Sequence, residues 1–314
     1  MTKVFIDGAE GTTGLKIFQR FETRKDIELL RIKDHLRKDK EERKKLLNEA
    51  DISFLCLPDA AAREAVELIE NKDARVIDTS TAHRTEKGWV YGFPELSKAY
   101  RSAVKESKRV AVPGCHASGF NSIIYPLIKE GIMGRDYPVS CFSITGYSGG
   151  GKKMIEEYSK GERSPELNSP RQYGITQSHK HLKEMKLIPG LLNEPLFSPI
   201  VADYYSGMTV TIPIYTSMLN KRLSLEEVRR FFSDYYSGQK LIRVLDKEEI
   251  EKNHGFIAAN TLEGRDSMEL IVEGNDQRLM IASRFDNLGK GASGAAMECM
   301  NIMLGLKPEE GLVV

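Results

Sequence analysis

The chain has 314 residues, 46 basic and 45 acidic side chains and a formal net charge of +1. A chain of this length builds about two globular domains, and its balanced charge excludes an extended basic surface for nucleic acid. The sequence contains no run of eighteen apolar residues, and a short apolar strand follows Met1 directly, without a secretory leader pattern. We therefore expect a cytoplasmic protein that contacts neither nucleic acid nor membrane.

The first third of the chain alternates short apolar runs with helical patterns. Strands are predicted over residues 3–6, 28–32, 51–57, 75–78 and 109–112, and helices over residues 15–21, 39–50 and 59–70. Parallel strands need crossover connections, so this order predicts an α/β fold with a Rossmann-like, doubly wound parallel sheet. The ligand crevice of such a sheet lies at the carboxyl ends of its strands.

A glycine turn, GAEGTTG, follows the first predicted strand and opens the first helix. Its spacing is GxxGxxG, which differs from the usual GxGxxG of dinucleotide-binding loops. Glycines here would let the backbone approach a pyrophosphate, while threonine hydroxyls could donate beside the helix N-terminus. An ordinary tight turn between strand and helix is the alternative. The residues predicted to hold the pyrophosphate are Gly8, Gly11, Thr12, Thr13 and Gly14.

The segment after the second strand indicates which nucleotide would bind. Lys33, Arg37 and Lys38 stand where an NAD site places an acidic residue, and cations there suit the 2′-phosphate of NADP. Asp34 keeps NAD open, and a solvated loop would have the same composition. Pro58, after the third strand, is expected to line the adenine side, although it also fits a simple helix start.

Cys115 lies in AVPGCHASGF, between a Pro-Gly turn and a predicted helix. The N–H groups at a helix N-terminus favour the thiolate, which makes this cysteine a candidate nucleophile. The alternative is a small buried side chain without chemistry. The four cysteines of the chain are scattered and lack metal-ligand spacing, so we expect reduced thiols, no disulfide and no metal site.

After Cys115 the predicted strands lengthen and intervening helices become few. Strands are expected over residues 139–145, 208–215, 240–245, 267–273 and 278–285, which predicts an α+β domain with a mostly antiparallel sheet. Ser224 and Glu227 form a capping-box pattern for a helix over residues 225–236. The helix predicted over 292–304 is expected to return to the first domain. The predicted domains are 1–115 with 290–314, and 116–289.

Several polar residues are candidate partners for the thiol. His179 and His181 alternate in QSHKHLKEM, so both could face one way, as structural residues or as a proton acceptor. Arg84, at the end of the fourth strand, could bind a phosphate or carboxylate or form a surface salt bridge. Asn287 and Lys290 lie in DNLGKG, which is either a linker or a loop that reaches the crevice.

Nine ordered segments resemble the shorter sequence type of the N-acetyl-gamma-glutamyl-phosphate reductases. They are VFIDGAEGTTG, LCLPDAAAREAV, VIDTSTAHR, WVYGFPEL, VPGCHASG, GYSGGGK, SHKHLKEM, EPLFSPIV and DNLGKGASGAA, and they cover nearly the whole chain. The resemblance implies an enzyme of arginine biosynthesis with the two-domain layout of the aspartate-semialdehyde and glyceraldehyde-3-phosphate dehydrogenases. It also implies a homo-oligomer, dimer or tetramer.

The resemblance implies a mechanism as well. Cys115 would attack an acyl phosphate to form a thioacyl intermediate that NADPH reduces, with His181, or in second place His179, moving the proton. Residues implied to bind the substrate are Arg84, Ser118 and Lys290. Residues implied to bind NADPH or NADP are the five of the glycine turn with Arg37, Lys38, Pro58, Ser80 and Asn287.

The chain departs from the family pattern at two places. Many relatives follow the cysteine with Tyr-Pro-Thr, where this chain has His116-Ala117-Ser118, and have Pro-Glu where it has Lys183-Glu184. The first departure adds His116 as a rival base, although a residue that only begins the helix is the favoured interpretation. Two alternatives remain: an enzyme of the aspartate-semialdehyde dehydrogenase type acting on a related acyl phosphate, and a non-catalytic NADP-binding sensor.

Overall fold

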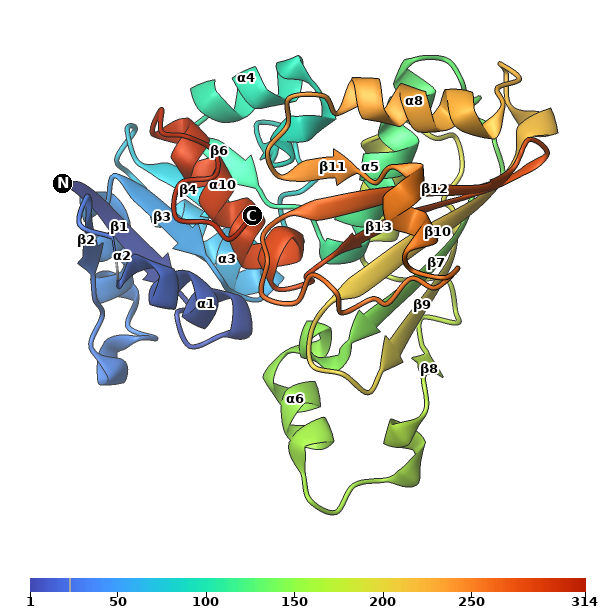
Figure 1. The fold of residues 1–314 in the computed structure, drawn as a ribbon. Coiled ribbons are helices and arrows are strands. Elements are labelled where there is room, and N and C mark those ends of the chain that lie inside the picture. The colour runs from blue at the N-terminus through green and yellow to red at the C-terminus, as the bar shows by residue number, and fades with distance from the viewer. Residues whose placement is uncertain (23) are drawn as a thin grey trace. The chain divides into compact units, whose positions relative to one another are not determined.

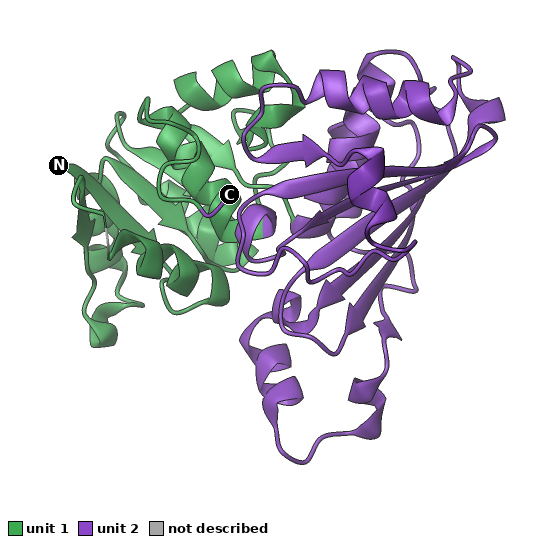
Figure 2. Ribbon diagram, in the orientation of Figure 1, with its two compact units in different colours: residues 1–114, 292–312 green, residues 115–291, 313–314 purple. Residues whose placement is uncertain are grey.

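The computed structural model describes residues 1–22 and 24–314. The chain divides into two compact units (Figure 2). Unit 1 comprises Met1–Gly114 and Ala292–Leu312, and unit 2 comprises Cys115–Gly291 and Val313–Val314. Cys115 is therefore the first residue of unit 2.

In the described residues of unit 1, six strands form a wholly parallel sheet in the order β2-β1-β3-β4-β6-β5 (Figure 1). The strands are β1 (Thr2–Asp7), β2 (Ile27–Leu30), β3 (Ile52–Leu55), β4 (Arg75–Asp78), β5 (Val90–Tyr91) and β6 (Arg109–Ala111). The order reverses at β1, which carries the glycine turn at its carboxyl end. A reversal of this kind opens a crevice for a ligand.

Helices cover both faces of the unit 1 sheet. They are α1 (Thr12–Phe21), α2 (Lys40–Glu49), α3 (Asp59–Glu67), α4 (Lys98–Glu106) and α10 (Gly294–Met303). Adjacent strand residues point to opposite faces, so Phe54 packs in the core with α1, α4 and α10, while Leu55 packs with α2 and α3. The predicted Rossmann-like, doubly wound fold is confirmed.

The C-terminal helix α10 packs closely in unit 1. A Cβ on Gly92 would lie 2.9 Å from the Cys299 sulfur, and that sulfur is 3.4 Å from the Gly92 carbonyl oxygen. The helix begins at Gly294, after a π-helical turn over Gly289–Ser293, and so two residues later than its apolar pattern predicts. Position 92 therefore needs glycine, because Cys299 of α10 lies directly against its backbone.

In the described residues of unit 2, seven strands form a mixed sheet in the order β11-β12-β13-β10-β7-β9-β8. The strands are β7 (Ser140–Gly146), β8 (Arg171–Gln172), β9 (Leu196–Ala202), β10 (Met208–Tyr215), β11 (Ile242–Val244), β12 (Met268–Asn275) and β13 (Arg278–Phe285). Most neighbours are antiparallel, as predicted, but β7 with β9 and β11 with β12 are parallel pairs. Strands β8 and β9 were not predicted.

Two long helices, α5 (Cys115–Lys129) and α8 (Leu225–Tyr235), pack against this sheet (Figure 1). A Cβ on Gly119 would lie 2.5 Å from Val210, so α5 nearly touches β10. The predicted capping box of Ser224 and Glu227 is present on α8. Unit 2 also holds α6 (Gly151–Ser159), α7 (Leu182–Leu187) and α9 (Lys247–Glu251). In the described part of the chain, no helix combines the length and apolarity needed to cross a bilayer.

The same sheet exposes an apolar face. Phe142 and Ile144 alternate outward along β7, and Leu196, Tyr215 and Met280 are exposed on β9, β10 and β13. Each is between 40 and 67% exposed, although large apolar side chains are usually covered. A row of such residues on neighbouring strands is typical of a surface that meets another protein.

Candidate active site

Cys115 differs from the other three cysteines in its position. All four are free thiols, and Cys115 is half-buried at the first position of α5. Burial raises the pKa of Cys56 to about 12 and raises that of Cys141 further, so both remain protonated thiols. Cys299 is fully buried in the unit 1 core. Cys115 is instead beside the N–H groups of a helix first turn, which stabilise a thiolate.

The backbone of the DNLGKG segment passes directly beside Cys115. A Cβ on Gly291 would lie 2.9 Å from the Cys115 Cβ, so a larger residue at 291 would collide with the cysteine. The Gly291 N–H donates to the Asp286 carbonyl oxygen at 2.9 Å, which holds the turn in place. The linker interpretation of DNLGKG is incomplete, because the structure places this segment against the candidate nucleophile.

Asn287 and Lys290 are both buried in this segment. The Asn287 side-chain amide donates to the Ser148 hydroxyl at 3.0 Å, and its oxygen accepts from the Gly207 N–H at 2.8 Å. Asn287 thereby fastens the DNLGKG segment to the glycine-rich stretch after β7. Lys290 lies next to Gly291 in the π-helical turn. The predicted contacts of these two residues with cofactor and substrate stay predictions.

Three histidine rings gather at His116, the residue that follows Cys115. The ring centroids of His116 and His181 are 5.5 Å apart, those of His116 and His179 5.6 Å, and those of His179 and His181 4.7 Å. Phe197 packs edge-on against His116 and His179, at 5.2 and 5.1 Å. The structure therefore brings the predicted pair His179 and His181 to the residue that follows the candidate nucleophile.

His116 is buried, and both of its ring nitrogens have hydroxyl partners. Nδ1 is 2.6 Å from the Ser143 hydroxyl on β7, and Nε2 is 2.7 Å from the Tyr173 hydroxyl. Burial, with the nearby charges of His179 and Lys180, lowers the pKa of His116 to about 3. The ring is neutral and weakly basic at neutral pH, which argues against His116 as the base. The favoured interpretation, a residue that only begins the helix, is incomplete, because the His116 ring also joins two other segments through its hydrogen bonds.

In unit 1, steric contacts explain the glycines of GAEGTTG. Gly8 has a φ of +90°, and a Cβ there would lie 2.4 Å from the Cys56 carbonyl oxygen. A Cβ on Gly14 would lie 2.4 Å from the Gly8 carbonyl oxygen. Gly11 caps α1, which begins at Thr12 and so three residues earlier than predicted. Thr12 and Thr13 therefore stand in the first helical turn, where N–H groups can bind an anion.

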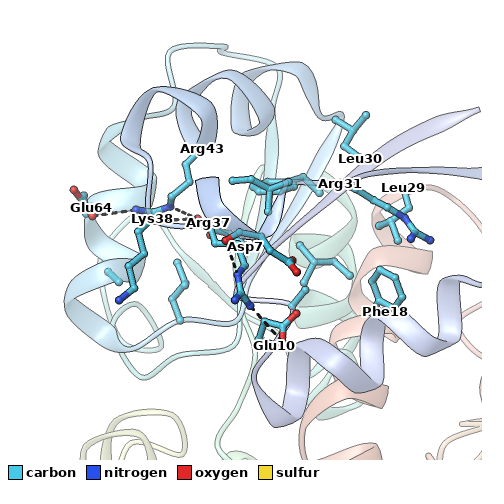
Figure 3. Close-up of a pocket in the computed structure, with 18 residues that line it drawn as sticks. Asp7, Glu10, Phe18, Leu29, Leu30, Arg31, Arg37, Lys38, Arg43 and Glu64 are labelled. Carbon is cyan, nitrogen blue, oxygen red and sulfur yellow. Dashed lines mark hydrogen bonds and ion pairs between the residues drawn. The ribbon is translucent and has the colours of Figure 1, made fainter.

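A cavity of about 750 Å³ opens at the carboxyl ends of β1 and β2 (Figure 3). Gly8, Arg37 and Lys38 line it, as predicted residues of the cofactor site, together with Glu10 and Asp34. Arg37 Nη1 is 3.3 Å from Glu10 Oε2, and Arg37 Nε donates to the Asp34 carbonyl oxygen at 3.1 Å. Exposed cations and residues of the glycine turn therefore line the same cavity.

The sequence analysis missed a buried ion pair in this cavity. Arg43 donates to Asp7 Oδ2 from Nη2 at 2.9 Å and from Nε at 3.1 Å, and its Nη1 donates to Glu64 at 3.2 Å (Figure 3). Burial is the largest influence on the Asp7 carboxyl and raises its pKa, although Arg43 opposes the shift. The only sequence signal was an acid directly before the glycine turn, because Arg43 looks like one more cation of a solvated helix.

The remaining predicted residues support the backbone. Ser80 donates to Asp78 through its N–H and its hydroxyl, at 2.9 and 2.8 Å. Arg84 donates to the carbonyl oxygens of Val112, at 2.8 Å, and Thr79, at 3.1 Å, and so ties together the segments that follow β6 and β4. Pro58 is the exposed N-cap of α3, and Ser118 is buried in the first turn of α5; their binding roles stay predictions.

Comparisons with known proteins match both units. The family model "Semialdehyde dehydrogenase, NAD binding domain" matches residues 3–105, and "Semialdehyde dehydrogenase, dimerisation domain" matches residues 115–287. Among solved structures, the chain is similar to aspartate semialdehyde dehydrogenase from Francisella tularensis. The TM-score is 0.73 and the identity 16%, with 97% of this chain and 100% of that chain covered. At this identity the likeness shows the fold alone.

Similarity to curated proteins is much higher. The chain is 43% identical to "N-acetyl-gamma-glutamyl-phosphate reductase 2" of a Nostoc species, with 99% of each chain covered. It is 44% identical to "N-acetyl-gamma-glutamyl-phosphate reductase" of a Chelativorans species, with 96% of this chain and 98% of that protein covered. The chain therefore belongs to the N-acetyl-gamma-glutamyl-phosphate reductase family, within the semialdehyde dehydrogenases.

Proposed function

We propose that this protein reduces N-acetylglutamyl 5-phosphate to N-acetylglutamate 5-semialdehyde, with release of phosphate, as a step of arginine biosynthesis. The observation that carries the proposal is Cys115 at the N-terminus of α5, beside three histidine rings. The names of relatives that are 43 and 44% identical support this substrate over aspartyl phosphate.

Unit 1 has the features that an NADPH site requires. A Cβ at Gly8 or Gly14 would fill the turn that a pyrophosphate must approach, so this cradle depends on glycine. The first turn of α1, with Thr12 and Thr13, would bind the pyrophosphate. Arg37 and Lys38 line the 750 Å³ cavity and would pair with the 2′-phosphate. The other proposed contacts of NADPH have less structural support; they are Gly11, Pro58, Ser80 and Asn287.

Cys115 supplies the nucleophile. Its thiolate attacks the acyl carbon, a C–S bond forms, and the C–O bond to phosphate breaks with the electron pair leaving on phosphate. When bound, NADPH supplies the hydride that reduces the resulting thioester. Collapse of the thiohemiacetal then breaks the C–S bond, returns the thiolate and yields the aldehyde. Arg84, Ser118 and Lys290 are proposed to hold the substrate, although Arg84 already donates to two backbone carbonyls.

His181 is the proposed proton carrier. His179 Nδ1 accepts the His181 backbone N–H at 3.2 Å, so a neutral His179 carries its own proton on Nε2. A ring nitrogen that already holds a proton cannot take one from the thiol or from the hydroxyl of the thiohemiacetal. His181, buried at the N-cap of α7, is left to accept that proton.

We also propose that the enzyme works in the cytoplasm as a homo-oligomer, a dimer or a tetramer. The match to a dimerisation domain and the apolar face of the unit 2 sheet support association with a second copy. Free thiols at all four cysteines fit a reducing compartment.

The test is phosphate-dependent reduction of NADP by N-acetylglutamate semialdehyde. We expect Cys115→Ser to lower kcat at least about 1,000-fold while NADPH binding, followed by fluorescence, is retained. Cys141→Ser, at a fully buried thiol, is the matched control and should keep its turnover. Faster turnover of aspartate semialdehyde would favour the sister dehydrogenase. Full activity of Cys115→Ser would contradict the proposed chemistry, and no turnover by the unmodified protein would indicate a sensor.

A further inference from the structure

A continuous chain of hydrogen bonds runs through the buried wall beside Cys115. It begins at the Ser143 hydroxyl on β7, passes through both nitrogens of His116 on α5, and ends at the Tyr173 hydroxyl, just after β8. Its two links are 2.6 and 2.7 Å long. Phe197 packs against the His116 ring and shields it from water.

The number of protons in these hydrogen bonds decides whether Tyr173 has one left to donate to a further acceptor. A neutral imidazole donates one hydrogen bond and accepts one. If Nδ1 carries the proton, Tyr173 must donate to Nε2, and its only proton is used. If Nε2 carries the proton, the Tyr173 oxygen accepts it, and the phenolic proton is available to another acceptor. In that case Ser143 donates to Nδ1, and every group in the chain is satisfied.

The surroundings supply a negative acceptor for the phenolic proton. Burial raises the pKa of Tyr173, and the charge of Cys115 raises it further, so the phenol stays protonated. Its hydroxyl is held 2.7 Å from a ring nitrogen of the residue next to Cys115. His116 follows Cys115 directly in α5, and the Tyr173 and His116 ring centroids are 6.2 Å apart. Only the second proton arrangement leaves the phenolic proton available for a hydrogen bond to this charge.

We propose that Tyr173 donates a hydrogen bond to the thiolate of Cys115, and that His116 and Ser143 are positioning residues that aim the phenol. The inference rests on the proposed function, in which this thiolate is the nucleophile. A hydrogen bond to a charged acceptor favours the charged form, so Tyr173 increases the fraction of reactive sulfur. The helix N-terminus acts in the same direction.

Other titratable groups also face this centre. His179 stands 5.9 Å from the Tyr173 ring, His181 stands 5.5 Å from the His116 ring, and the charge of Lys180 acts on His116. Each can change the pH response of the sulfur. The experiment must therefore change one hydroxyl at a time and leave these residues in place.

The test follows alkylation of Cys115 by iodoacetamide as a function of pH, with the labelled peptide quantified by mass spectrometry. In Tyr173→Phe, we expect the apparent pKa of Cys115 to rise by about one unit. We expect kcat to fall about tenfold, with the KM for NADPH unchanged. Tyr137→Phe is the matched control, because Tyr137 is a buried tyrosine of unit 2 whose hydroxyl accepts from the Tyr215 backbone N–H, and it should leave the alkylation profile unchanged.

Two substitutions of His116 distinguish its effect on the orientation of the Tyr173 phenol from its contribution to packing. In His116→Gln the side-chain amide nitrogen stands near the place of Nε2 and can still donate to Tyr173, so we expect a nearly normal alkylation profile. In His116→Asn the amide reaches Ser143 but stops short of Tyr173, so we expect the profile of Tyr173→Phe. Thermal melting of each variant reports whether the fold is retained.

The possible outcomes are distinct. A wild-type profile and kcat in Tyr173→Phe would overturn the proposal, and equal profiles of His116→Gln and His116→Asn would overturn the role of His116. If the acyl phosphate is not turned over but the alkylation shift is observed, the proposed function fails and the thiolate contact stands. If Cys115→Ser is inactive and no shift is observed, the thiolate contact alone fails.

Discussion

The glycine turn of unit 1 and the histidine cluster of unit 2 both lie at a helix N-terminus, but they are built from different parts of the chain. At α1 the backbone forms the site, because Gly8 and Gly14 leave no room for a Cβ. The side chains around it, such as Arg37 and Glu10, are 44 and 63% exposed. At α5 the site consists of buried and half-buried side chains, with hydroxyls and a neutral imidazole in place of exposed charges.

This difference predicts how each site responds to change. Exposed charges are screened by water and salt, so single substitutions at Arg37 or Lys38 should have graded effects. A buried polar group that loses its partner costs far more, because no water replaces that partner. Unit 1 should therefore be sensitive to added atoms and unit 2 to lost hydrogen bonds.

The largest expected effect in this comparison is that of Gly14→Ala. The new Cβ would stand 2.4 Å from the Gly8 carbonyl oxygen, so the turn must open. We expect the Kd for NADPH to rise more than about 100-fold, while iodoacetamide still labels Cys115 at the wild-type rate. Gly161→Ala, in open space, should bind NADPH normally. Loss of Cys115 labelling together with NADPH binding would show that the two sites are not independent.

An intermediate effect is expected from the double variant Arg37→Ala with Lys38→Ala. Both cations line the cavity, and their loss removes the attraction for a 2′-phosphate without disturbing the turn. The KM for NADPH should rise about tenfold or more, while the KM for NADH changes less than about twofold. Lys40→Ala, a neighbouring exposed lysine, serves as the control. An equal rise for NADH and NADPH would exclude selection of the 2′-phosphate here.

The smallest effect is the contribution of His116 to stability at acid pH. The unfolded chain binds a proton on this imidazole below about pH 6.5, whereas the folded chain does so only near pH 3. Acid therefore favours the unfolded chain, and stability is lost as pH falls below 6.5, by about 1 kcal/mol per pH unit. Urea unfolding at pH 7.5 and 5.5 should show this loss in the wild type and a smaller loss in His116→Gln. Identical losses would contradict the burial of a neutral His116.

Much of the fold follows from local patterns in the sequence. Strands β4, β10 and β13 have the predicted bounds at both ends, because strongly apolar or alternating residues end at clear turns. Strand β9 was missed because Pro199 interrupts its pattern, yet it pairs in parallel with β7 along its whole length. Its partner β8 has two residues, too few for periodicity to detect.

The candidate site was only partly predictable. Cys115, His179 and His181 stand out because their residue types carry chemistry, and the resemblance to a family singled out the same residues. Tyr173 carries no such signal in RQYG, since only the fold brings it within 2.7 Å of His116. Arg43 was missed for the opposite reason: it looks like a surface cation, but the return of α2 against β1 buries it on Asp7.

Two of the points at which the backbone passes between units, after Gly114 and after Gly291, lie beside Cys115, since a Cβ on Gly291 would stand 2.9 Å from the Cys115 Cβ. Anyone who wished to graft the nucleotide-binding half of a relative onto this protein would have to make two of the splices directly beside Cys115. Modular exchange is therefore a poor route to a new coenzyme preference here. Point substitutions in the unit 1 cavity leave both of these joints untouched.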